Sequence, residues 1–146
     1  MKSRVRSAFT LVELLIVVVI LAVLAATIIP QFTDSTRDAQ ESTTLFNLHT
    51  LRSQIQMYRT QHGGTAPGNA LLELTSQTDR DGNIAAGNPY GPYITEIPEN
   101  PFNRSATIKV ITNTKPVATD VSATDGWLYN ATTGGIWISH ADYFTE

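Results

Sequence analysis

The longest apolar run of the sequence lies near its start, where "FTLVELLIVVVILAVLAATII" spans residues 9–29. As a helix this run would be about 31 Å long at 1.5 Å per residue, close to the roughly 30 Å hydrocarbon core of a bilayer. Glu13 is its one ionisable side chain. A carboxylate is costly in a membrane-spanning segment and persists there when it has a partner or a function. Glu13 is therefore the first candidate functional residue.

The apolar pattern continues beyond Pro30, but with the period of an amphipathic helix. Apolar side chains recur at spacings of three or four residues and form one stripe, which comprises Leu45, Leu48, Leu51, Ile55 and Tyr58. Gly63 and Gly64 then predict the end of the helix. We expect a helix from Phe9 to His62 that Pro30 interrupts, because proline lacks the N–H that would bond the carbonyl of Ala26.

The remaining residues predict a small globular domain. Asn69 is a candidate N-cap for a short helix from Ala70 to Gln77. The segment "GNPYGPYITEIPENPFN" (87–103) is rich in proline and glycine, which excludes a regular element. We expect an ordered loop there, with four packing residues: Tyr93, Pro98, Pro101 and Phe102.

The last third of the chain has the pattern of strands. A strand in "TIKVITN" (107–113) is followed by a hairpin in "GWLYNATTGGIWIS" (126–139). Together these elements predict an α+β fold, in which a long N-terminal helix packs against a small sheet of about three antiparallel strands.

The charge distribution restricts the partners. The formal net charge is −3, and three of the ten Lys and Arg residues, Lys2, Arg4 and Arg6, precede the apolar run. By the positive-inside rule this basic cluster keeps the N-terminus cytoplasmic in a single-pass topology. Residues 31–146 hold the other seven bases and twelve acids, which give a net charge of −5. A nucleic-acid-binding domain is expected to be basic, so we expect no nucleic-acid partner. The sequence has no cysteine, so it has neither a disulfide framework nor a thiol site.

Three interpretations of the N-terminus are open. A secretory signal peptide would be cleaved before Ala26, and a plain membrane anchor would stay uncleaved. In the third, "AFTLVELLIVVVILAVLAATIIPQF" resembles the class III signal of type IV pilins and type II secretion pseudopilins over its whole length. A basic leader, a small residue, Phe, a glutamate and a long apolar helix with an internal proline occur in the family's order. One position departs from it, because Ala8 stands where the family mostly has glycine.

That resemblance implies a pilin-like fold and a division of the chain into four parts. These are a leader peptide (1–8), a transmembrane and assembly helix (9–30), an amphipathic helix (31–62) and a small globular domain (63–146). It implies that prepilin peptidase cleaves between Ala8 and Phe9 and that the new amine of Phe9 is methylated. It also assigns Glu13 and Pro30 to subunit assembly.

Two further segments resemble the major pseudopilins of type II secretion in particular. They are "TLRSQIQMYRTQHGG" at the helix end and "GPYITEIPENPFN", with its Gly-Pro-Tyr and Pro-x-Asn-Pro-aromatic patterns. The resemblance implies a structural subunit that is held in the inner membrane, with its C-terminal domain in the periplasm. With copies of itself, other pseudopilins and the inner-membrane assembly platform, it would build a periplasmic fibre for protein secretion.

Two alternatives to the pseudopilin are kept. One is a type IV pilus subunit, which the absence of the terminal cysteine pair common in type IV pilins disfavours. The other is a membrane-anchored periplasmic binding protein that uses its aromatic residues to hold a ligand.

Candidate chemistry elsewhere is weak. Asp79, Asp81 and Gly82 resemble the start of a calcium loop but lack its closing glutamate. Asp120 and Asp125 are the only acids near the place where many pseudopilins hold calcium. We therefore expect no cofactor, with calcium as the one cation left open. The three histidines have no ligand spacing and no nucleophile pattern is present, so we expect a protein that is not an enzyme.

Overall fold

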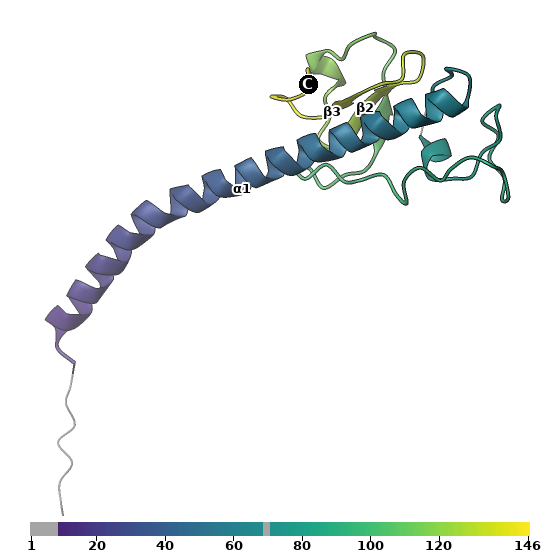
Figure 1. Cartoon of the computed structure of the whole chain (residues 1–146). Helices are drawn as coiled ribbons and strands as arrows, with labels where there is room; N and C mark the ends of the chain where they lie inside the picture. The colour runs from purple at the N-terminus through teal and green to yellow at the C-terminus, as the bar shows by residue number, and fades with distance from the viewer. Residues whose placement is uncertain (1–8, 69–70) are drawn as a thin grey trace, which may run out of the picture. The chain divides into compact units, whose positions relative to one another are not determined.

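The structure is a computed structural model that describes residues 9–68 and 71–146. The chain forms two compact units, Met1–Ala39 and Gln40–Glu146. In chain order its elements are α1 (Leu11–Gln61), η1 (Leu72–Leu74), β1 (Ile108–Val110), η2 (Ala118–Asp120), β2 (Trp127–Asn130) and β3 (Gly135–Ile138) (Figure 1). The predicted α+β class, with a long N-terminal helix and a small sheet, is confirmed.

Helix α1 lies within two residues of the predicted bounds at each end. The helix continues through position 30, because one missing N–H leaves the neighbouring turns bonded; the Pro30 side chain is not among those described. At the C-terminus Gly63 has a φ of 66°, and the N–H of Gly64 donates to the carbonyl of Arg59 at 2.7 Å. This is the terminal bond of a Schellman motif, which needs the left-handed conformation that glycine adopts without strain.

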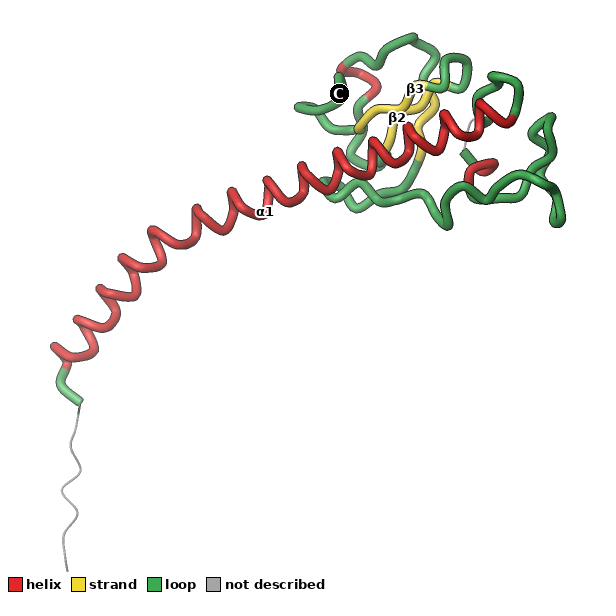
Figure 2. The backbone as a smooth tube through the Cα atoms, viewed as in Figure 1, coloured by secondary structure: helices red, strands yellow, loops and turns green. Residues whose placement is uncertain are grey.

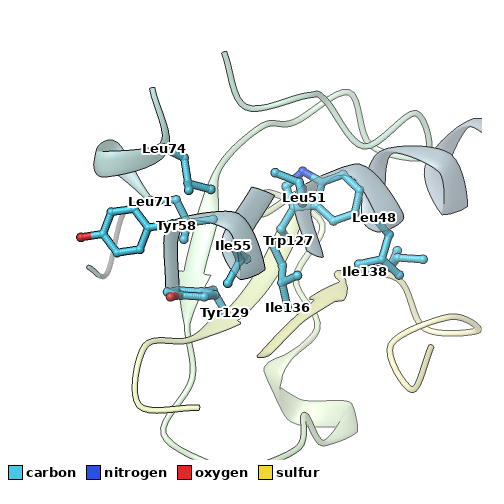
Figure 3. Packing of buried hydrophobic residues seen from close by; sticks show 10 residues of the cluster. All are labelled: Leu48, Leu51, Ile55, Tyr58, Leu71, Leu74, Trp127, Tyr129, Ile136 and Ile138. Atoms are coloured by element: carbon cyan, nitrogen blue, oxygen red, sulfur yellow. The ribbon is translucent and has the colours of Figure 1, made fainter. Parts of the chain in front are cut away.

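The core of the second unit lies between the C-terminal half of α1 and the sheet. Leu48, Leu51 and Ile55 have no exposed surface, which confirms the predicted stripe. They pack in one cluster with Tyr58, with Leu71 just before η1, and with side chains from η1 and the strands, namely Leu74, Trp127, Tyr129, Ile136 and Ile138 (Figure 3). Each fully buried side chain of this kind contributes about 1.5–3 kcal/mol relative to an exposed one, so the cluster is the main source of stability in this unit.

The sheet has the strand order β1-β2-β3 and is mixed, so the prediction of an antiparallel sheet is wrong. Strands β2 and β3 form the predicted antiparallel hairpin, with Trp127 opposite Ile138 and Tyr129 opposite Ile136. Strand β1 pairs with β2 in parallel. Parallel neighbours need a crossover of a dozen or more residues, and residues 111–126, which include η2, provide it. Figure 2 shows the sheet beside the C-terminal half of α1, with loops forming most of the rest of the unit.

The predicted helix from Ala70 to Gln77 is also wrong, because η1 is a single three-residue turn. Leu71, immediately before it, has a φ of 54°, a left-handed conformation through which an α-helix cannot continue. Leu71 and Leu74 are both fully buried. Their burial in the core therefore determines the backbone conformation of this segment and outweighs its helix propensity. The expected cap, Asn69, and the first residue of the predicted helix, Ala70, lie outside the described residues.

Candidate functional site

The N-terminal part of α1 presents an uncovered apolar surface in the first unit. Every side chain from Phe9 to Ile28 is exposed, with an exposed fraction of 81% for Leu11 and 53% for Val19. The span Leu11–Ile28 has a mean hydropathy of 3.0 and no buried residue, and its length and composition suffice to cross a membrane. A continuous apolar surface of this kind requires lipid or another protein to cover it.

At the start of this surface Thr10 and Glu13 form a capping box. The Oε2 atom of Glu13 accepts the N–H of Thr10 at 2.8 Å and its hydroxyl at 2.9 Å, and Thr10 Oγ1 accepts the N–H of Glu13 at 3.2 Å. The backbone donors of a first turn have no partner inside the helix, so these bonds define where α1 begins. Thr10 is not among the residues predicted from the sequence, although a Thr-x-x-Glu spacing before an apolar run is a sufficient signal for a capping box.

The capping box leaves one oxygen of the Glu13 carboxylate free. Both bonds from Thr10 go to Oε2, and Oε1 has no hydrogen-bond partner within the described part of the chain. The Glu13 side chain is exposed in its unit. An ionised carboxylate has about four acceptor positions in all. Glu13 can therefore cap its own helix and bind a cationic group from elsewhere at the same time.

The predicted processing site is described only in part. Phe9 is 78% exposed, just ahead of the helix start. Ala8 lies outside the described residues. Of the two residues that flank the predicted cleavage point, the structure therefore describes only Phe9, and Phe9 is accessible.

The aromatic residues of the loop at 87–103 pack against α1 and the C-terminal segment. Tyr93 donates its hydroxyl to Gln61 Oε1 at 2.6 Å, and its ring meets that of Tyr58 edge to face at 5.7 Å. Burial raises the pKa of Tyr93, and it raises the pKa of Tyr58 to about 12, so both hydroxyls are neutral at physiological pH. Phe102 stacks on Tyr143 with the ring centroids 5.1 Å apart.

The two predicted prolines of this loop act through their carbonyl groups. Trp127 Nε1 donates to the carbonyl of Pro98 at 2.8 Å, and Gln40 Nε2 donates to that of Pro101 at 3.3 Å. Prolines have no N–H of their own, so a loop rich in them is held by donors from other elements. Sequence analysis missed Gln40, because a polar residue on a helix carries no sign of the loop that it will bond.

Two of the acids considered for calcium, Asp79 and Asp120, accept hydrogen bonds from residues close by in the chain. Asp79 Oδ1 accepts the N–H groups of Asp81 and Asn83, and Oδ2 accepts Asn83 Nδ2, each at 2.9 Å. The side-chain bond from Asn83, followed by the backbone bonds, holds the pKa of Asp79 below its usual value. Asp120 Oδ2 likewise accepts the N–H of Val117 at 2.9 Å. Among the described residues no three His, Cys, Asp or Glu side chains lie together in a way that could hold a metal ion.

Two comparisons with known proteins found similarities to this chain. Residues 3–29 match the family model of the prokaryotic N-terminal methylation motif. A fimbrial protein of Neisseria meningitidis serogroup A / serotype 4A is 33% identical over 80 residues, which are 55% of this chain and 47% of that protein. The chain thus spans about half the length of the curated relative that it matches. No solved structure matches it.

The family model covers Arg4 and Arg6 of the basic leader, Glu13 and the whole of the exposed apolar surface. The matched motif and the fimbrial relative therefore agree with the resemblance seen in the residues, and the fold is of the predicted α+β class. The chain therefore has an N-terminal methylation motif of the prepilin type and is similar to a fimbrial protein over about half of its length.

Proposed function

We propose that the protein is a structural subunit of a helical fibre and that its apolar helix holds it in the inner membrane until assembly. The observation that carries this proposal is the exposed apolar surface from Phe9 to Ile28, which lies in the segment that matches the methylation motif. Lipid covers this surface before assembly and the helices of other copies cover it in the fibre, so it stays out of water in both states. The N-terminus faces the cytoplasm and the globular unit the periplasm.

In this proposal prepilin peptidase removes residues 1–8 and methylates Phe9. Cleavage after Ala8 removes three bases, so the formal charge of the chain changes from −3 to −6. It also creates a positively charged amine at Phe9, four positions before Glu13. The exposure of Phe9 supports access of the peptidase to this bond.

Glu13 has two tasks in the proposed assembly. In its own subunit it caps α1 through Thr10. In the fibre its second oxygen binds the amine of Phe9 in a neighbouring copy, because a paired carboxylate is tolerated in an apolar bundle and an unpaired one is costly. The charge then sets the axial position of an incoming subunit. Pro30 lowers the cost of loosening α1 in the packed fibre.

Among fibre types we favour the pseudopilus of a type II secretion system, with other pseudopilins and the inner-membrane assembly platform as partners. Support comes from the Gly-Pro-Tyr and Pro-x-Asn-Pro-aromatic patterns of the loop and from the absence of cysteine. The similarity to a fimbrial protein supports a surface pilus as the second candidate. Either role is structural rather than enzymatic and requires no cofactor.

Two measurements test the proposal. Intact-mass analysis of protein extracted from its native membrane should find a methylated Phe9 at the N-terminus, and crosslinking should join copies of the chain. An N-terminus at Ala26 would overturn the proposal in favour of a secretory signal. Deletion of the protein should abolish secretion of exported proteins and leave surface fibres in place; the opposite pattern would identify a surface pilus subunit.

A further inference from the structure

Two adjoining cavities in the globular unit have no task in the proposed fibre function. Their volumes are about 370 Å³ and 310 Å³, and both are lined by Arg52, Lys115 and Trp137. Gln56 and Thr133 also line the first cavity, and Thr145 and Glu146 also line the second. We call these seven residues the Trp137 trough. Its two cavities are of the size of small-molecule sites, which is roughly 300–1,000 Å³.

Trp137 forms a flat aromatic wall of this trough. It lies between the buried residues Ile136 and Ile138 of β3, so its side chain is on the opposite face of the strand and is only half-buried. Gly135 lies on that same face, and a Cβ at this position would collide with the six-membered ring of the indole. The ring therefore rests directly on the glycine backbone, which supports it from one side.

The trough also contains one cation that the fold does not use. Arg52 donates to the carbonyl of Ile136 at 3.1 Å and to a main-chain oxygen of Glu146 at 2.6 Å, so its guanidinium is engaged, and the negative charge of Glu146 lies near it. Lys115 is exposed and has no hydrogen bond or ion pair with the residues that the structure describes. An unengaged ammonium group thus lies in the same trough as an indole.

We propose that the Trp137 trough binds an acidic sugar, a pyranose ring that carries a carboxylate. A sugar ring has an apolar C–H face that can lie on an indole, and a rim of hydroxyls that matches Gln56, Thr133 and Thr145. The carboxylate of a uronic acid pairs with Lys115 in a charge-assisted hydrogen bond. A neutral sugar leaves Lys115 unused, and a small inorganic anion leaves the indole unused. Such binding does not depend on fibre assembly.

The test uses the full chain in nanodiscs of phosphatidylcholine, which avoids detergents with sugar head groups. Galacturonic acid and galactose, which differ at the carboxylate, are titrated by calorimetry, and tryptophan fluorescence reports on the trough. Galacturonic acid should bind about tenfold more tightly than galactose, as one charge-assisted bond provides. Equal binding of the two sugars, no saturable binding, or equally effective competition by inorganic phosphate would overturn the proposal.

Three variants locate the site. Lys115→Gln should reduce galacturonic acid binding about tenfold and leave galactose binding unchanged. Arg80→Gln is the matched control, because it removes one exposed positive charge outside the trough. An equal loss of galacturonic acid affinity in Lys115→Gln and Arg80→Gln would show an effect of net charge alone and refute the site. Gly135→Ala should weaken both sugars by displacing the indole, and unchanged binding in it would also refute the site. Thermal unfolding of each variant verifies that it is folded.

Discussion

Thr10 and Glu13 bond one another in both directions at the first turn of α1, over distances of 2.8–3.2 Å. The same carboxylate thus has a local task in the helix and a free oxygen for a proposed partner. Glutamine can complete a capping box as glutamate does, but it carries no charge. The two tasks are therefore separable by substitution.

Glu13→Gln should leave membrane insertion, cleavage after Ala8 and the start of α1 intact, while copies of the variant fail to join the fibre. Thr10→Ala removes the cap and keeps the charge, so it should loosen the first turn in hydrogen exchange and retain assembly. Mass analysis measures processing and crosslinking measures assembly. Normal fibres from Glu13→Gln would show that the charge has no part in assembly.

The fragment Gln31–Glu146 should be soluble, monomeric and folded. Its core is built from residues after position 47, and the fragment lacks the exposed apolar surface that requires a partner. Fluorescence of Trp127 and Trp137 should report one cooperative unfolding transition. A fragment that is unfolded, or that forms regular fibres alone, would show that the folding and assembling parts are not separate.

Ile55→Ala should lower the free energy of unfolding by about 2–5 kcal/mol, because it leaves a cavity between α1 and the sheet. Ile55 has no exposed surface, whereas Met57 on the same helix is 51% exposed. Met57→Ala is therefore the control and should change stability by less than about 0.5 kcal/mol. Denaturant unfolding of both variants measures the difference. A similar effect of the two substitutions would contradict the core assignment.

Asp79 should contribute to acid sensitivity. Hydrogen bonds lower its pKa in the folded state, so its contribution is fully present above the unfolded pKa of about 3.9 and is lost as the pH falls through the lower folded value. Stability of the parent protein should therefore fall more steeply below about pH 4 than that of Asp79→Asn. Denaturant midpoints between acidic and neutral pH measure this, with Asp81→Asn as control. Identical pH profiles of Asp79→Asn and the parent would refute it.

Local pattern in the sequence was sufficient for α1, its stripe and the β2–β3 hairpin. Each depends on residues close in the chain: a spacing of three to four, a glycine pair after the last turn, and alternation around a short turn. The N-terminal signal is also a local pattern, and the capping box could equally be predicted from the spacing of Thr10 and Glu13.

The parallel pairing of β1, the loss of the helix at 70–77 and the Trp137 trough depended instead on residues far apart in the chain. Ile108 pairs with Trp127 because a long crossover returns the chain to the same end of the sheet. Leu71 adopts a left-handed backbone because its burial against α1 outweighs the local preference for helix. Arg52, Lys115 and Trp137 come from three separate segments. Their proximity arises from the packing of the core, and packing energy depends on which surfaces meet, which no local spacing in the sequence reveals.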